Sequence, residues 1–210
     1  MGRNWMLEDD AISFDEEKDA TIRRMRDLLA VRMKDAAKRH RHSLGVARTA
    51  ASLALVYDVD VFSAYAAGLI HDWDKVIPDD EMLARALRYH IPIEGDPAQA
   101  SPLLHGPVAA RELVELFGEL PSEVFQAVAR HTLAAPDMTP LDMVVFVADG
   151  IEPNRHGAYA EHQRDLVGDV TLEELFLTSF IGGISYVLDT RRYLYPGTVS
   201  IYNDYMTKKG

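Results

Sequence analysis

The chain of 210 residues contains no cysteine. This excludes disulfides and thiolate metal sites, so a bound transition metal would need histidine and carboxylate ligands. The absence of cysteine also fits a reducing compartment, and we expect the protein to be cytoplasmic. Long apolar runs are missing too, because a charge interrupts each one before it could span a bilayer, and we expect no membrane partner. The amino end lacks the basic-then-apolar pattern of a secretory signal.

Positive charge is in short supply. Lysine and arginine total 22 against 33 aspartates and glutamates, which gives a net charge of −11. An acidic surface repels nucleic acid backbones, so we expect no nucleic acid partner unless a local basic patch overrides the net charge. The one basic stretch, Arg23 to Arg41, also contains Leu28, Leu29 and Val31. This mixture favours the solvated face of an amphipathic helix.

Continuous strand patterns are absent, and the sequence predicts an all-α fold in the form of a helical bundle. Asp15 or Thr21 is suited to begin the first helix, and prolines stand where several others would begin. The expected helices cover about 15 or 21 to 40, 42–57, 61–72, 78–89, 105–117, 121–131, 140–149 and 172–192. A short strand at 143–147 is the β alternative. We expect residues 1–20 to form a flexible acidic segment and residues 21–210 a single domain.

An adjacent His-Asp pair, His71-Asp72, ends a segment rich in small apolar residues. Alone, such a pair is more often a capped helix end or a surface salt bridge. Four further candidates lie near the ends of other expected helices: His42, His105, His131 and Asp149. Inward-facing histidine and carboxylate side chains from different helices are a usual way to build a metal site in a bundle.

The six residues divide into two sets of ligands. His42, His71, Asp72 and Asp149 would hold one cation, and His105 and His131 a second, with the Asp72 carboxylate bridging the two. Mixed nitrogen and oxygen ligands suit iron, manganese, cobalt, nickel or zinc better than calcium or magnesium. The sequence does not choose among these metals. The other histidines (His40, His90, His156 and His162) fit surface or capping positions.

Several motifs resemble a known family. They are His42-Ser43-Leu44-Gly45-Val46-Ala47, Gly68-Leu69-Ile70-His71-Asp72 with Lys75, Leu104-His105-Gly106-Pro107-Val108, Arg130-His131-Thr132, and Ala148-Asp149 with Ile151-Glu152-Pro153 and Arg155. Their order is similar to that of the HD-domain metal-dependent phosphohydrolases, and together they resemble the YqeK-type branch from about residue 42 to 192. That branch consists of bacterial di-iron enzymes that split diadenosine tetraphosphate symmetrically into two ADP.

The resemblance implies a nucleotide or dinucleotide substrate and two metal ions, with iron as the expected metal. It implies the six ligands named above, with Asp72 and Lys75 in catalysis and Lys75, Arg155 and Thr132 at the substrate. Two neighbouring cations acidify a bridging water to hydroxide and stabilise charge on the attacking and leaving oxygens, so no side-chain nucleophile is needed. The basic side chains near the phosphates would offset the acidic surface.

The sequence departs from the family pattern at several positions. Leu133-Ala134-Ala135 replaces a Thr-Gly-like continuation, Met143 stands where a lysine is frequent, and Gly150 replaces an aromatic residue. Tyrosines at 195 and 202 replace a histidine and an arginine. These changes leave the six ligand positions intact and concern substrate recognition.

Three alternatives stay open: a nucleotide-binding sensor without turnover, a hydrolase of another nucleotide such as a guanosine polyphosphate, and a di-iron oxygenase. The oligomeric state also stays open, with a homodimer among the options.

Overall fold

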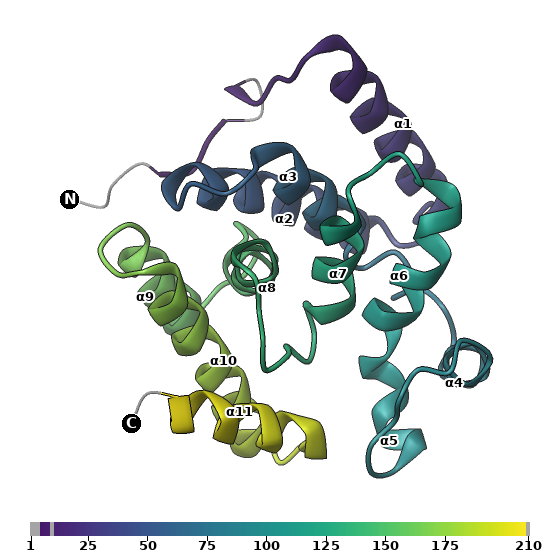
Figure 1. The fold of residues 1–210 in the computed structure, drawn as a ribbon, viewed down its shortest axis with the longest axis vertical. Helices are drawn as coiled ribbons and strands as arrows, with labels where there is room; N and C mark the ends of the chain where they lie inside the picture. The colour runs from purple at the N-terminus through teal and green to yellow at the C-terminus, as the bar shows by residue number, and fades with distance from the viewer. Residues whose placement is uncertain (1–4, 9–10, 209–210) are drawn as a thin grey trace.

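The structure, a computed structural model, describes residues 5–8 and 11–208. Within these residues it contains eleven α-helices, a short 3-10 helix at Ser101–Leu103 and no strand (Figure 1). The α-helices are α1 (Glu16–Arg32), α2 (Ala37–Val56), α3 (Val61–Ile70), α4 (Asp79–Arg88), α5 (Pro97–Ala100), α6 (His105–Leu116), α7 (Ser122–Arg130), α8 (Pro140–Ile151), α9 (Ala158–Leu166), α10 (Leu172–Asp189) and α11 (Pro196–Lys208). The all-α prediction is confirmed, and the short strand considered at 143–147 lies inside α8.

Small residues bring α2 and α3 into close contact. Ala47, Ala50 and Ala51 on α2 are fully buried, as are Ala64 and Gly68 on α3. A Cβ atom added to Gly68 would lie 2.9 Å from the Cα of Ala47, a distance that side chains do not tolerate. Glycine is therefore required here for the two backbones to approach, and this approach fixes how the ends of α2 and α3 lie relative to one another.

Helix α8 runs through the middle of the bundle, where Figure 1 shows it end-on between α2, α7 and α10. Thr139 and Asp142 form a capping box at its start, each side chain bonding the backbone N–H of the other. The buried Asp142 carboxylate also accepts hydrogen bonds from Gln126 and Arg130 of α7, at 3.0 and 2.9 Å. The start of α8 is thus fixed to the end of α7.

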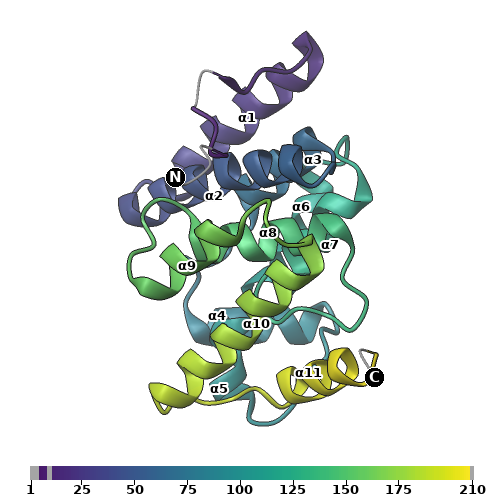
Figure 2. The same ribbon diagram turned by 90° about the vertical axis from the view of Figure 1, so that its left-hand side faces the viewer.

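Helix α1 lies at one end of the molecule, as Figure 2 shows, and packs on α3. Asp15 caps its start by accepting a hydrogen bond from the N–H of Lys18. Residues 1–4 and 9–10 of the predicted flexible segment lie outside the described residues. In the described part, Trp5 and Phe14 pack against the core, and Phe14 contacts Phe62 edge to face. The division into a flexible segment and one domain stays a prediction.

The first helical stretch differs from expectation. The sequence predicts one helix to about residue 40, but α1 ends at Arg32 and α2 begins at Ala37, which places His42 in the second turn of α2. The turn at 33–36 is stabilised by the N–H of Ala36 bonding the carbonyl of Met33. It contains neither glycine nor proline, so no breaker residue marks it in the sequence.

Three helices were not predicted, namely α5, α9 and α11. Helix α9 is polar, and α11 begins with Pro196-Gly197, so neither shows a continuous apolar stripe. Helix α11 is held through Tyr205, which packs on Phe176 of α10 and accepts a hydrogen bond from the N–H of Met138 at 3.3 Å. Tertiary contacts of this kind, and not local periodicity, stabilise these elements.

Candidate metal centre

Five helices bring six histidine and aspartate residues to one place in the core. His42 lies on α2, His71-Asp72 directly follow α3, His105 begins α6, His131 directly follows α7, and Asp149 lies in the last turn of α8. Five of the six are buried, and Asp149 is partly exposed. These are the six residues that the sequence marks as ligand candidates. Their positions form overlapping groups in which donor atoms lie within 4.8 Å of one another.

One half of the cluster surrounds Oδ2 of Asp72. The Nε2 atoms of His42 and His71 lie 3.7 and 3.5 Å from this oxygen and 3.3 Å from each other. Oδ1 of Asp149 completes the group, at 3.0 Å from Nε2 of His42 and 4.0 Å from Nε2 of His71. Two nitrogens and two carboxylate oxygens therefore face a common point.

The other half surrounds Oδ1 of Asp72. The Nε2 atoms of His105 and His131 lie 3.1 and 3.7 Å from this oxygen and 3.0 Å from each other. The two oxygens of the Asp72 carboxylate thus face two separate pairs of histidines. This is the arrangement expected of a carboxylate that bridges two cations.

Hydrogen bonds at the far nitrogen orient each ring. Nδ1 of His71 donates to the carbonyl of Gly68 at 2.7 Å, and Nδ1 of His131 donates to that of Val128 at 2.7 Å. Nδ1 of His105 lies 3.1 Å from the carbonyl of Pro102. A carbonyl oxygen only accepts, so each Nδ1 carries a proton and each Nε2 faces the cluster. Adjacent Nε2 lone pairs repel one another unless a cation lies between them, and the donor set therefore fits metal ions.

The charges agree with this geometry. Burial lowers the pKa of His42, but hydrogen bonds to Asp149 and Glu152 outweigh burial and raise it to about 9. The carboxylates around His42 thus stabilise positive charge, and the same potential favours a metal cation. Burial lowers the pKa of His105 to about 4, so this ring is neutral and its nitrogen free to coordinate. Burial raises the pKa of Asp72, yet the surrounding histidines hold it well below its usual range.

Glu152 is a buried residue of the site to which the sequence assigned no role. Its Oε1 accepts a hydrogen bond from Nδ1 of His42 at 3.0 Å, and its Oε2 accepts two from Asn154 at 2.8 Å. A Cβ atom on Gly45 would lie 2.5 Å from Oε2, so the glycine makes room for the carboxylate. Its signs in the sequence are its place in the motif Ile151-Glu152-Pro153 and its position three residues after Asp149.

The three expected substrate residues border the cluster from different sides. Nζ of Lys75 donates to the carbonyl of Pro102 at 2.8 Å and lies 3.3 Å from Nδ1 of His105. The Arg155 guanidinium bonds Oδ1 of Asp149 at 2.7 Å. The Thr132 hydroxyl lies 3.2 and 3.0 Å from the Nε2 atoms of His105 and His131. All three therefore lie within one side-chain length of the candidate ligands.

A cavity of about 840 Å³ opens beside His42. Four basic residues line it: Lys38, Arg39, Arg41 and Arg155. Arg39 also bonds Oδ2 of Asp72 at 2.5 Å, a contact that the sequence did not predict, since this stretch was interpreted as a solvated helix face. Two acidic residues, Asp35 and Glu152, also line the cavity, so basic residues outnumber acidic ones in its wall although the protein as a whole is acidic.

Comparison with known proteins identifies the family to which this helical fold and its histidine and aspartate cluster belong. The HD domain family matches residues 39–154, which contain all six candidate ligands. The chain belongs to the HD domain family. No helix in the described part of the chain is long and apolar enough to cross a membrane.

Individual relatives within this family have names that state an activity. The chain is 30% identical over 171 residues to the symmetrical bis(5'-nucleosyl)-tetraphosphatase of Halalkalibacterium halodurans, covering 81% of this chain and 90% of the relative. It is 29% identical over 179 residues to the Bacillus subtilis protein of the same name, covering 84% and 94%. A predicted HD superfamily hydrolase involved in NAD metabolism from Clostridium acetobutylicum has a similar structure, with a TM-score of 0.78 and 29% identity, covering 87% of this chain and 97% of the other.

Proposed function

We propose that the protein is a metal-dependent phosphohydrolase that cleaves diadenosine tetraphosphate into two ADP. The observation that carries the proposal is the Asp72 carboxylate, whose two oxygens face separate pairs of histidines. This arrangement supports two cations with Asp72 between them. Cations bound there would polarise a phosphoanhydride and activate a water as the nucleophile. Iron is the metal we expect, because the resemblance implies it and the donor set suits it.

The side chains around the cluster have separable roles in this proposal. His42, His71, Asp72 and Asp149 hold one cation, and Asp72, His105 and His131 hold the other. Arg155 and Lys75 bind substrate phosphates, since each reaches the cluster from one side. The Thr132 hydroxyl, next to the second pair of histidines, donates a hydrogen bond to a phosphate oxygen.

The substrate assignment rests on the relatives and on the basic cavity. Two relatives, of which the chain covers 90% and 94%, are named symmetrical bis(5'-nucleosyl)-tetraphosphatases. The cavity beside His42, with four basic residues in its wall, suits a polyphosphate chain. We place this activity in the cytoplasm, in keeping with the lack of cysteine. Nothing in the proposal requires a second subunit, nucleic acid or a membrane.

A product assay tests the proposal. Iron-loaded protein is incubated with diadenosine tetraphosphate, and the nucleotides are separated by ion-exchange chromatography. We expect ADP as the sole product, and no turnover by the His105→Ala variant. Formation of ATP and AMP would contradict symmetrical cleavage. Binding of the dinucleotide without turnover by the wild type would contradict the hydrolase and favour the sensor.

A further inference from the structure

A smaller cavity of about 220 Å³ reaches the His105–His131 half of the cluster through Thr132, whereas the basic cavity is lined by His42 of the other half. Thr132 belongs to both the cavity and the cluster. It lines the cavity, and its hydroxyl lies 3.2 and 3.0 Å from the two Nε2 atoms. A ligand group bound in this cavity would therefore lie close to a phosphate bound at His105 and His131.

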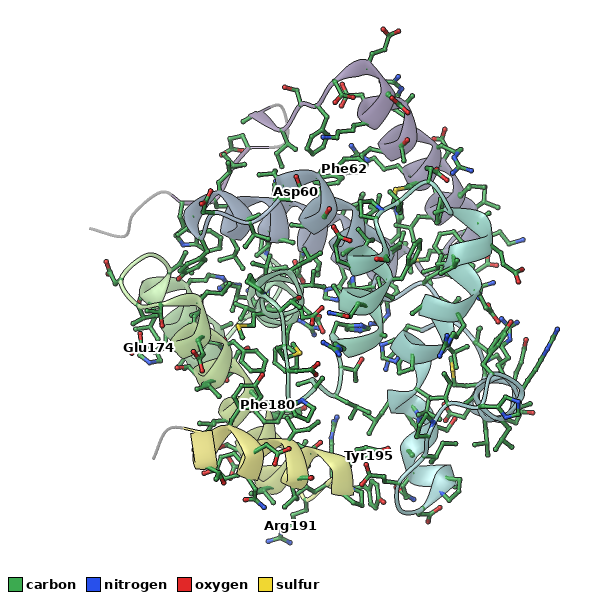
Figure 3. The ribbon with its side chains drawn as sticks, viewed as in Figure 1. Asp60, Phe62, Glu174, Phe180, Arg191 and Tyr195 are labelled. Atoms are coloured by element: carbon green, nitrogen blue, oxygen red, sulfur yellow. The ribbon has the colours of Figure 1, made fainter. Side chains whose placement is uncertain are left out.

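The walls of this cavity are formed by aliphatic and aromatic side chains and are uncharged. None of the twelve residues that line it carries a charge, so a phosphate would find no counter-charge there. Phe146 and Phe180 contribute from α8 and α10, and Tyr193 and Tyr195 from the segment before α11. Figure 3 shows Phe180 and Tyr195 in the same part of the molecule. Such walls suit a flat, uncharged ring.

Hydrogen bonds hold the two tyrosine rings in place. The hydroxyl of Tyr193 accepts a hydrogen bond from the N–H of Asp96 at 3.1 Å, and that of Tyr195 accepts one from the N–H of Glu94 at 3.0 Å. Rings fixed in this way lose little conformational entropy when a ligand stacks on them. The cavity is thus a preformed aromatic slot.

Resting on the proposed function, we propose that this cavity binds the adenine base of the nucleotide whose phosphates lie at His105 and His131. The volume supports a base alone, because pockets that enclose a whole ligand measure about 300–1,000 Å³. The other half of the dinucleotide then extends along the basic cavity beside His42. The cluster would lie between the two halves, as cleavage in the middle of the tetraphosphate requires.

Gly183 offers a way to fill the cavity without disturbing the fold. It lines the cavity from within α10, and a Cβ atom added there meets nothing within 4 Å. Gly183→Leu should fill the slot while improving helix propensity, because leucine is the better helix former. Ser185→Leu on the same helix is the matched control, since Ser185 is exposed and does not line the cavity. Tyr195→Ala is a second variant that removes a stacking face.

The test is calorimetric binding of ADP and of inorganic pyrophosphate to the metal-loaded protein. We expect wild type to bind ADP about tenfold more tightly than pyrophosphate, equivalent to about 1.4 kcal/mol for the base. Gly183→Leu and Tyr195→Ala should each lose most of this difference, with pyrophosphate affinity unchanged. Ser185→Leu should match wild type.

Equal affinity for ADP and pyrophosphate in wild type would overturn the base site, as would undiminished ADP affinity in both cavity variants. The proposed function fails separately. If wild type does not hydrolyse diadenosine tetraphosphate but the variants still lose ADP affinity, the base site stands and the hydrolase does not.

Discussion

Asp72 is the residue on which both halves of the cluster depend, because each of its oxygens faces a different pair of histidines. We predict that Asp72→Ala purifies with neither metal ion, whereas His105→Ala loses mainly one of the two. Metal content measured by plasma mass spectrometry distinguishes the variants. An Asp72→Ala protein that keeps two ions per chain would show that the carboxylate does not bridge.

Glu152 orients the candidate ligand His42 through the ring nitrogen that faces away from the cluster. Its carboxylate holds Nδ1 of His42, and Asn154 holds the carboxylate in turn. We predict that Glu152→Gln weakens metal affinity by about tenfold to a hundredfold, the usual effect of losing such an outer partner. Competition with a fluorescent chelator measures the affinity, with the exposed Glu161→Gln as the control. Unchanged affinity would mean that backbone packing alone orients His42.

Lys75 and Arg155 are assigned to the substrate and not to the metals. Replacing either by alanine should leave metal content unchanged and lower kcat/KM by about tenfold to a hundredfold, since each charge-assisted hydrogen bond is worth roughly 1.5–3 kcal/mol. Lys34→Ala, an exposed change in the turn before α2, is the control. Loss of metal from the Lys75 variant would assign that lysine a structural role.

At the scale of residues, the sequence pointed to the six candidate ligands that the structure brings together, but not to the side chains that hydrogen-bond to them. The six candidates are marked by type and by their place near helix ends. Glu152 and Arg39 are defined instead by partners far along the chain, His42 and Asp72 respectively. Such contacts depend on the packing of helices, which no local pattern states.

At the scale of elements, the close contact of α2 and α3 positions His42 relative to His71. A Cβ atom at Gly68 would lie 2.9 Å from the Cα and 3.0 Å from the N of Ala47. Gly68→Ala should therefore push the helices apart, lower the free energy of unfolding by about 1–3 kcal/mol and reduce metal content. Urea unfolding measures the first effect, with Gly183→Ala, which meets open space, as the control. A stable, fully metallated Gly68→Ala protein would refute this account of the contact.

Most helices were predicted because proline or a capping residue marks where they begin, as at Pro140 with Thr139 before it. Helix α9 was not predicted, because it lacks such a signal at its start. Its Arg164 donates to the carbonyls of Ile151, Glu152 and Arg155 at 2.8, 2.7 and 2.6 Å, and so holds the end of α8 beside the cluster. A polar helix that is held by the hydrogen bonds of individual side chains, here Arg164 and Tyr159, leaves little periodic pattern to detect.

At the scale of the whole molecule, charge is divided unequally. The chain has a net charge of −11, yet a basic cavity and an uncharged aromatic cavity flank the cluster. Composition predicted the overall acidity but not these cavities, because each is lined by segments far apart in the chain. Leu103 and Tyr195, for example, line the same cavity. The tyrosine that departs from the family pattern thus belongs to a wall of the proposed base site.

The central claim is that the six residues form one centre for two cations. Anomalous diffraction from a crystal of the protein purified with iron, collected on both sides of the iron edge, tests it most directly. We predict two anomalous peaks, one between His42, His71, Asp72 and Asp149 and the other between Asp72, His105 and His131. A single peak in crystals with full metal occupancy, or peaks away from these residues, would contradict the account.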